Sequence, residues 1–503
     1  MVIYDGVGST RDSGRCSPHK EQSELCGAAI SWETAEWRKW RKRYSRFSVK
    51  PLYTLFATLL LLTSAGAAPE PRWHAIESAG YADPRQYGFL NALLGDVEVV
   101  SLAESIHMTH EFPLIRIGMV RYLNENLGFH TVALEGSPED LWVTQDQFLA
   151  SPDTGLSQAM AGVFGLWNTP EMAQLFRYEA ASWSTAHPLY LTAYDIQPGM
   201  GSGTEGPRVL QMLVERLKSY SPPPPDFDEG KWLAATGRLT SSCSGYQPSE
   251  DALIDSAIGS IEQWIIAAAP KVQQRFPNVP HAALLRLVPA NLRASLSLCQ
   301  VVGSGRRDWR LYKRTRDRLA ARFALTLKTA APGGKLMLWA HISHLFYDDS
   351  GKNTSVGEIL HSLLGPKLYT LATFALGGGT IVLFDDTKED IGYAFVRGNA
   401  GTLKNELDQR CRPACFVDMR GTTDKMLLTT QPVWFEAGIK PMIPAKNFDG
   451  IVWVHDIHPP GIPLGTLLDY SVVHYRWQLA GAALAIVLAF VLCGGLLLHR
   501  RSK

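Results

Sequence analysis

Short apolar runs separated by longer helical stretches dominate the middle of this chain. Four of them predict buried strands, at Val97–Leu102, His130–Leu134, Leu189–Tyr194 and Lys335–Ala340. Runs of this length that are rich in Val, Leu and Tyr are typical of parallel strands covered on both faces. The segments between them are long enough for helical crossovers, so the pattern favours an α/β fold.

Helical spacing supports the same fold. Apolar residues at Ile115, Met119 and Leu123 predict a helix over Phe112–Leu127, with Gly128 as its end. Residues 207–330 read as a helical insertion that could form a wall or lid over the sheet. Later strands are expected at Tyr369–Phe374, Thr380–Phe384, Tyr393–Val396 and Ile451–His455. We therefore expect a central, mostly parallel sheet flanked by helices, with a helical insertion.

Both chain ends carry patterns of membrane targeting. Leu479–Leu498 is an uncharged run long enough to cross a bilayer as a helix, and the basic tail His499–Lys503 predicts that residues 499–503 are cytoplasmic. Leu52–Leu62 followed by Ala65-Gly66-Ala67 resembles the end of a signal peptide. Translation could begin at Val49, which would make residues 1–48 a non-native or untranslated extension and 49–67 the signal peptide.

On this interpretation residues 68–476 form one exported α/β domain, anchored to the inner membrane by a single span and facing the periplasm. Composition agrees with a folded body, since 46% of residues are hydrophobic, 19% are charged and the net charge is +1. Such a balance gives no support for nucleic acid as a partner. In an oxidising compartment, Cys243–Cys299 and Cys411–Cys415 are candidate disulfides, although sequence alone does not fix the pairing.

Ionisable residues stand where each of the four central strands should stop. The first strand runs into Glu104 and His107, the second into Glu135, the third into Asp195, and the fourth into His341 with His344 one turn later. Open α/β sheets bind their ligands at the carboxyl ends of parallel strands. We therefore expect these acids and imidazoles to converge on one edge of the sheet, where they can perform acid–base chemistry.

Each candidate has a proposed role and an ordinary structural alternative. Glu104 lies three residues before His107 and can orient its imidazole, or it can be a capping carboxylate beside a solvated histidine. Arg116 could anchor Glu104 or Glu135, stabilise an oxyanion, or form a surface ion pair. Asp195 is assigned to a supporting role, and His110 is expected to be an exposed helix residue.

The joint pattern resembles the erythromycin esterase family over most of residues 95–460. Leu102–His107 with Glu111-Phe112 and Arg116 is similar to its first signature, and Leu127–Glu135 to its second. Further similarity lies in Trp167–Glu171, Asp195, Arg316-Asp317 and Trp339–His344. The chain departs from the family pattern at Ala103, where Gly is usual, and at Ile342, where Asn is usual.

The resemblance implies a metal-independent attack of activated water on an ester carbonyl, without a cofactor. It implies that Glu104, His107, Arg116, Glu135 and a histidine of the 341/344 pair carry the reaction. The expected partner is a hydrophobic small-molecule ester or lactone, macrolide or otherwise. Trp232, Tyr246 and Trp264 of the insertion could line its cleft, or could form the core of the insertion itself.

Two other functions stay open from the sequence. The donors His107, His110, Glu111, His341 and His344 could hold a divalent metal in a Tiki-like metal-dependent hydrolase or protease. No H-E-x-x-H helix is present. The chain could also be a binding or cell-surface biosynthesis module that keeps the fold without turnover.

Overall fold

The computed structural model describes residues 73–240, 243, 245–303, 308–347, 355–383, 391–396, 407, 410–435 and 438–461. The predicted extension, signal peptide, anchor and tail all lie outside these residues and stay predictions. Within the described part, the stretch Pro248–Arg275 is long and apolar enough to cross a membrane. Its residues Ile258, Ile261 and Trp264 are buried in the protein core.

An eight-stranded sheet forms the centre, in the order β1-β9-β12-β6-β2-β5-β3-β4. Six neighbouring strands, from β12 to β4, are parallel to one another. At the other side of the sheet, β9 runs antiparallel to both of its neighbours, β12 and the edge strand β1. The predicted mostly parallel sheet flanked by helices is confirmed. The strands are β1 (Trp73–Ile76), β2 (Val99–Glu104), β3 (Thr131–Leu134), β4 (Tyr190–Ala193), β5 (Leu336–His341), β6 (Leu368–Ala375), β9 (Ala414–Asp418) and β12 (Gly450–Val454).

Two hairpins stand apart from this sheet. β7 (Gly378–Leu383) pairs with β8 (Ile391–Val396), and β10 (Gln431–Phe435) pairs with β11 (Gly438–Met442). The sequence analysis did not anticipate β1, β9 or the β10–β11 pair. These strands are short, and the last pair contains Pro432 and Pro441, which weaken the strand pattern.

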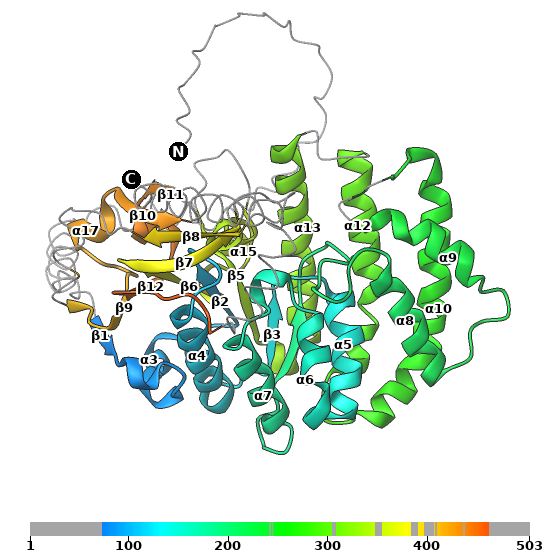
Figure 1. Cartoon of the computed structure of the whole chain (residues 1–503), viewed down its shortest axis with the longest axis horizontal. Coiled ribbons are helices and arrows are strands. Elements are labelled where there is room, and N and C mark those ends of the chain that lie inside the picture. The colour runs from blue at the N-terminus through cyan, green and yellow to red at the C-terminus, as the bar shows by residue number, and fades with distance from the viewer. Residues whose placement is uncertain are drawn as a thin grey trace, which may run out of the picture. The chain divides into compact units, whose positions relative to one another are not determined.

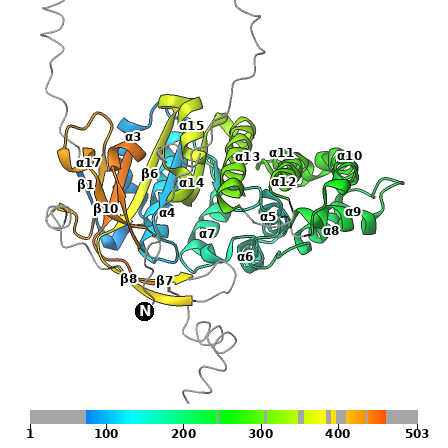
Figure 2. The same ribbon diagram turned by 90° about the horizontal axis from the view of Figure 1, so that it is seen from above.

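Helices cover both faces of the sheet and extend beyond its β4 edge (Figures 1 and 2). The helices of the first half are α3 (Leu90–Leu93), α4 (Glu111–Leu127), α5 (Pro138–Ala150), α6 (Pro152–Ala161) and α7 (Met172–Ser182). Between β4 and β5 follow α8 (Arg208–Tyr220), α9 (Glu229–Thr236), α10 (Asp251–Arg275), α11 (His281–Leu285), α12 (Val288–Val302) and α13 (Trp309–Ala330). The rest are α14 (Ile342–Leu345), α15 (Val356–Leu364), α17 (Lys425–Leu428) and α18 (Pro444–Asn447).

Alternation along the strands divides the core into two layers. Val100 and Leu102 of β2 pack into the cluster that contains α4 and α7, while Val99 and Ala103 pack into the cluster shared with the inserted helices. Figure 2 shows α13 nearest the sheet and α8 to α10 farthest from it. Two inserted helices reach the strand ends: α13, and α12, whose Asn291 donates to the Asp195 carbonyl at 3.1 Å.

The aromatic residues of the insertion form its own core. Trp232, Tyr246 and Trp264 are at most 2% exposed, so the alternative in which they line a substrate cleft is wrong. Cys243 and Cys299 form a disulfide within this helical block, and Cys411 pairs with Cys415, which are the two candidate pairs of the sequence analysis.

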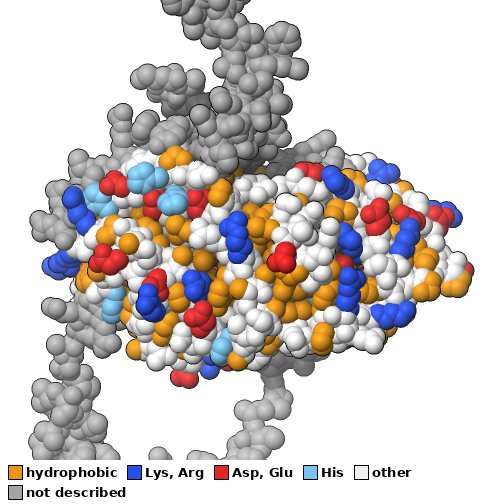
Figure 3. All heavy atoms as spheres, turned by 60° about the horizontal axis from the view of Figure 1, so that its bottom comes forward, with side chains coloured by type: hydrophobic (Ala, Val, Ile, Leu, Met, Phe, Trp, Pro, Cys, Tyr) orange, Lys and Arg blue, Asp and Glu red, His pale blue; other side chains and the backbone are white. Residues whose placement is uncertain are grey.

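Surface charge is mixed on the face shown in Figure 3. Basic and acidic side chains are interspersed there, with apolar side chains between them. An interspersed surface does not create the single-sign field that attracts a polyanion. This face agrees with the net charge of +1 in giving no support for a nucleic-acid partner.

Candidate active site

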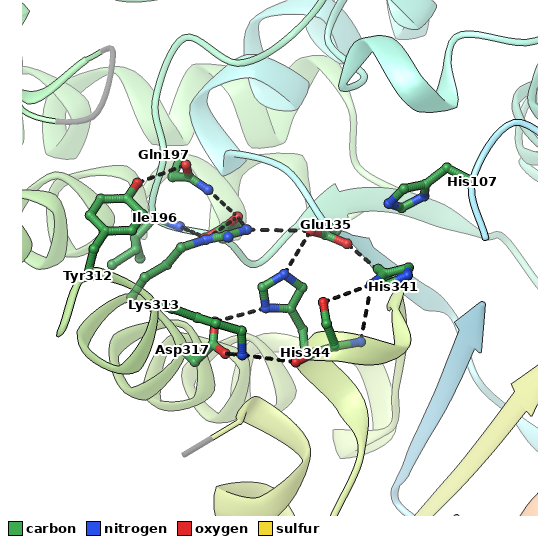
Figure 4. A network of polar contacts seen from close by, with 12 residues as sticks. His107, Glu135, Ile196, Gln197, Tyr312, Lys313, Asp317, His341 and His344 are labelled. Carbon is green, nitrogen blue, oxygen red and sulfur yellow. Dashed lines mark hydrogen bonds and ion pairs between the residues drawn. The ribbon is translucent and has the colours of Figure 1, made fainter. Parts of the chain in front are cut away.

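The predicted site residues meet at the carboxyl ends of β2, β5 and β3. Glu104 at the end of β2 lies in register with His341 at the end of β5 and with Thr373 of β6. Glu135 directly follows β3, and its amide donates to the Trp339 carbonyl at 2.8 Å, which continues the ladder toward β5. Figure 4 shows His107, Glu135, His341 and His344 around this edge. The pleat and register therefore bring together side chains that lie far apart in the sequence.

His107 and Glu104 form an imidazole–carboxylate pair. His107 Nδ1 lies 2.7 Å from Glu104 Oε1, and the Glu104 side chain is only 2% exposed. A carboxylate facing Nδ1 holds the proton on that nitrogen and leaves Nε2 as the basic one. The pair thus has the arrangement of a general base with its orienting acid.

Arg116 supports Glu104 from behind. Its guanidinium donates to Glu104 Oε2, lies 3.9 Å from the centre of the Trp339 ring, and is fully buried. Trp167 covers a second side, with its ring centre 5.2 Å from the guanidinium. An arginine enclosed in this way acts on Glu104, and this position favours the anchoring role over direct contact with an oxyanion.

The loop that carries His107 is held by several elements. Thr380 of β7 donates its hydroxyl to the carbonyls of His107 (3.1 Å) and Met108 (2.7 Å). Met108 has a φ of +55°, a conformation that non-glycine residues adopt rarely. The amide of His110 donates to the His458 carbonyl at 2.8 Å. These contacts fix a strained turn beside His107, as is common at functional sites.

His341 lies beside His107, with 4.8 Å between the two ring centres. Its Nδ1 accepts from the Ser343 amide at 3.2 Å, because His341 caps the short helix α14. An accepting Nδ1 assigns the proton to Nε2, which lies 3.2 Å from the Ser105 carbonyl. A neutral imidazole with its N–H near His107 can donate a hydrogen bond to a reacting oxygen.

Glu135 is a carboxylate held between several donors. Its Oε2 accepts from the His341 amide at 2.9 Å, and its Oε1 lies 3.2 Å from His344 Nε2 and 3.4 Å from Arg316. Burial alone would raise the pKa of Glu135, but the charges of His344, Arg316 and His107 outweigh it and hold the pKa well below its usual range. Glu135 therefore stays ionised in the pH range of most assays.

His344 differs from His341 in both contacts and charge. Its Nδ1 lies 2.9 Å from Asp317 Oδ1 while its Nε2 faces Glu135, so both nitrogens meet carboxylates. Burial would lower the pKa of His344, but Asp317 and Glu135 together raise it to about 9. His344 is thus an imidazolium with both protons engaged, and of the two histidines His341 is the one placed beside His107.

A further ion pair closes the network on the side of the insertion. Arg316 of α13 donates to Asp195, with Nε 2.9 Å from Oδ1, and burial of the guanidinium is outweighed by Asp195 and Glu135, which raise its pKa. Asp195 thus has the supporting position expected of it. The network holds as many cations as carboxylates: Arg116, Lys313, Arg316 and His344 stand against Glu104, Glu135, Asp195 and Asp317.

The side chains that were candidate ligands of a divalent metal do not lie together in the structure. Among the described residues, no group of three or more His, Cys, Asp or Glu side chains is arranged to hold a metal ion. His110 Nδ1 faces Glu171 at 2.6 Å, and Glu111 faces His458 at 2.6 Å, both away from His107. His110 precedes α4 and is not an exposed helix residue: its side chain is about half exposed and pairs with the buried Glu171. This arrangement does not fit a metal centre built from His107, His110, Glu111, His341 and His344.

Sequence reasoning missed the part that α13 plays in the site. Lys313 and Asp317 have the i, i+4 spacing of a surface ion pair, yet Asp317 is 1% exposed and contacts His344. The role of Trp167 beside Arg116 and His107 was also not anticipated. The signal for both lay in the resemblance, which already included Trp167 and Asp317, and not in any local pattern.

Comparisons with known proteins bear on the family and the fold of this chain. The family model of erythromycin esterase matches residues 271–457. The resemblance to the erythromycin esterase family is confirmed. YbfO of Bacillus subtilis (strain 168), a candidate hydrolase by its name, is 22% identical over 447 residues, covering 82% of this chain and 98% of YbfO. These relatives indicate a hydrolase.

Solved structures share the fold at low identity. A succinoglycan biosynthesis protein is similar with a TM-score of 0.58 and 13% identity, covering 78% of this chain and 96% of that chain. A mutant of the erythromycin esterase EreC in its open conformation has a TM-score of 0.52 and 16% identity, covering 78% of this chain and 99% of that chain. At these identities the likeness supports the fold, and the site has to be argued from its own residues.

Proposed function

We propose that this protein hydrolyses an ester or lactone bond of a neutral, mostly apolar small molecule, with water activated by His107. The observation that carries the proposal is the Glu104–His107 pair, 2.7 Å apart, with the His341 ring 4.8 Å from the His107 ring. A base and a hydrogen-bond donor side by side are what the addition of water to a carbonyl requires.

In the first step, His107 Nε2 takes a proton from water while the water oxygen attacks the ester carbonyl carbon. Glu104 stabilises the imidazolium that forms, and Arg116 keeps Glu104 in place. His341 Nε2–H, which lies 3.2 Å from the Ser105 carbonyl in the free protein, turns to the substrate carbonyl oxygen and donates to it as negative charge develops there. Collapse of the tetrahedral intermediate then expels the alkoxide, which takes the proton back from His107. General base catalysis of this kind supplies roughly 10²–10⁴-fold in rate.

The ionised Glu135 is assigned to orienting His341. Its Oε2 accepts a hydrogen bond from the His341 amide at 2.9 Å, so Glu135 holds the backbone at the point where β5 is followed by α14. His344 keeps Glu135 ionised from the opposite side. In this assignment His341, and not His344, meets the substrate.

The balance of charges supports a neutral substrate. Each cation in the network already faces a carboxylate, so the site offers no uncompensated charge for an anionic or cationic group. The names of the relatives are compatible with macrolactones among the substrates, since one of them is an erythromycin esterase. A bulky apolar ester or lactone is therefore the class that we propose.

A substrate panel tests this function. The full-length protein is incubated with simple esters, aromatic esters and macrolactones, and products are identified by mass spectrometry as a gain of one water. Wild type should convert at least one compound, and His107→Ala should lose that activity while its circular dichroism spectrum stays unchanged. Equal turnover by the two proteins would overturn the role of His107, and cleavage of peptides alone would overturn the substrate class.

The same preparation separates the metal-dependent alternative. The metal-independent mechanism predicts that activity persists in the presence of a chelator. It also predicts that elemental analysis finds no stoichiometric zinc or manganese in the protein. Tightly bound metal with activity lost to chelator would favour the Tiki-like alternative instead.

We also propose that residues 68–476 lie outside the cytoplasm and are held at the inner membrane by Leu479–Leu498. The disulfides Cys243–Cys299 and Cys411–Cys415 support an oxidising compartment. A reporter enzyme that works only outside the cytoplasm should be silent when fused after Lys503 and active when fused near Pro459. The reverse pattern would contradict this topology.

A further inference from the structure

A chain of contacts runs from the insertion into the site. On α13, Lys313 Nζ lies 3.0 Å from Asp317 Oδ2, and Asp317 Oδ1 lies 2.9 Å from His344 Nδ1. His344 Nε2 lies 3.2 Å from Glu135 Oε1, and Glu135 Oε2 accepts the His341 amide at 2.9 Å. Figure 4 shows these side chains pointing toward one another across the strand ends. Asp317 is the one carboxylate of this chain of contacts that belongs to the inserted helices.

We infer that Asp317 is a positioning residue for the proposed hydrolase: its carboxylate keeps His344 doubly protonated, and so holds Glu135 and the backbone of His341 in place. The inference rests on the proposed function and extends it to a residue that does not meet the substrate. It also makes α13 part of the catalytic apparatus, because the helix supplies the charge on which the strand ends depend.

The geometry requires this arrangement. A neutral imidazole has one N–H and one acceptor nitrogen, so between two carboxylates it would leave a buried lone pair facing a buried negative charge. Two carboxylates are compatible only with the imidazolium, which donates to both. If the His344 imidazolium lost one of its two N–H protons, Glu135 would face a neutral imidazole, which stabilises its carboxylate less than the imidazolium does.

Other charged groups facing His344 do not replace Asp317. Lys313 and Arg316 come from the same helix α13, and both are cations that disfavour a charged imidazole. Glu135 contributes from the end of β3, but its Oε1 lies 3.2 Å from His344, farther than Asp317 Oδ1 at 2.9 Å, and its influence on the His344 pKa is the smaller of the two. Tyr194 beyond β4 lies near the same carboxylates, and burial beside them raises its pKa, so it stays neutral. Asp317 is therefore the partner that decides the protonation of His344.

Asp317→Asn removes the charge and keeps the shape. Without that charge His344 should release its proton at a pH lower by roughly 1–3 units, the usual effect of an opposite charge at this distance. In wild type that release falls at about pH 9. In a plot of kcat against pH, the fall of kcat at basic pH (the basic limb) should shift to lower pH by the same amount. KM should change little, because the substrate does not contact Asp317.

Lys313→Met is the matched control, since Lys313 contacts the same carboxylate from the other side. Removing a cation should move the basic limb to higher pH, opposite to Asp317→Asn. Asp317→Glu, which restores the charge, should bring the limb back toward its wild-type position. If Asp317→Asn fails to fold, Lys313→Met still decides, since a basic limb that stays at its wild-type position or moves to lower pH in this variant would contradict the inference.

A direct measurement does not depend on turnover. The His344 ring is titrated by nitrogen NMR of protein labelled in its histidines, with the resonance assigned from its loss in His344→Gln. The expected result is a lower titration point in Asp317→Asn together with the shifted basic limb. An unchanged titration point, or a lowered one without any change in the kcat profile, would overturn the positioning role. If wild type cleaves no ester, the proposed function fails, and the titration still shows whether Asp317 holds the proton.

Discussion

Two sets of buried carboxylates in this molecule behave in opposite ways. At the strand ends, the pKa of Glu135 and that of Asp317 lie below their usual range despite burial, because neighbouring cations outweigh it. In the helical layer beside the sheet, burial raises the pKa of Glu139 and Glu179 to about 8 and that of Asp140 to about 7. All three of these side chains are fully buried, so burial alone does not explain the difference.

The neighbours explain it. Glu135 faces the cations His344 and Arg316, whereas Glu179 faces only neutral donors, Gln145 Nε2 at 2.9 Å and the Leu191 amide at 2.8 Å. Neutral donors satisfy a carboxyl group without stabilising its charge as strongly as a cation does. The comparison teaches that paired cations keep the buried carboxylates of the proposed site charged, whereas Glu139 and Glu179, which lack such partners, serve as neutral structural links near neutral pH.

The largest expected effect is at Glu135. Glu135→Ala leaves the buried cations His344 and Arg316 without one of their partners, which typically costs about 3–5 kcal/mol. Esterase turnover should be lost as well, since the His341 amide loses its acceptor. Urea denaturation measures the first effect and the substrate panel the second. A stability close to that of wild type would mean that the cations are not dependent on Glu135.

From pH 5 to 9, stability should fall as the pH rises. Glu135 and Asp317 have lowered pKa values, so their contribution is already complete above about pH 5, whereas the groups with raised pKa values lose theirs within this range. Glu139, Glu179 and Asp140 have folded pKa values above those of the unfolded chain, so the folded state binds more protons between about pH 4 and 8. His344 adds a loss between its ordinary value of 6.5 and about 9. Unfolding free energies measured from pH 5 to 9 should decline throughout, and a maximum near pH 9 would contradict the comparison.

Glu179→Gln should flatten that decline. The amide cannot ionise, and once the Gln145 amide turns over, the new N–H₂ can donate to Gln145 Oε1, which has no partner among the described residues. The variant should therefore be more stable than wild type at pH 9 and within about 1 kcal/mol of it at pH 5. Thermal melts at the two pH values give the answer, with Glu262→Gln on the exposed side of α10 as a control that should leave both unchanged.

The smallest effect is expected at Asp140, which holds the glycine loop after β4. Its Oδ2 accepts from the Gly199 amide at 2.9 Å, and Thr204 donates to its Oδ1. Asp140→Asn can keep one oxygen as an acceptor, so the cost should be about 1 kcal/mol. Esterase activity should stay near that of wild type. A loss as large as that of Glu135→Ala would show that the two regions are not separate.

How much of the molecule can be predicted from its sequence depends on the range of the interaction. The four central strands and the residues at their ends follow from local apolar runs, so the sequence alone places Glu104, Glu135 and His341 on one edge of the sheet. The strand β9, between β12 and the edge strand β1, was missed because its residues Ala414–Asp418 are few and its pairing with both neighbours is not encoded locally.

The protonation states and ion pairs of the site cannot be predicted from the sequence either, because they also depend on contacts between distant segments. Lys313 and Asp317 sit in a stretch rich in arginine and aspartate that is typical of a solvated helix face. Only the packing of α13 against the strand ends turns Asp317 inward to His344, 27 residues away in the chain. Likewise, no pattern distinguishes His341 from His344, since their roles depend on which carboxylates they meet.

The central claim is that His107, oriented by Glu104, activates water for attack on an ester carbonyl. The most direct test is turnover of a cleaved ester in water enriched in heavy oxygen, followed by mass spectrometry of both products. The account predicts one labelled oxygen in the carboxylic acid, none in the alcohol, and no labelled product with His107→Ala. Label in the alcohol, or the same labelled acid from His107→Ala, would contradict it.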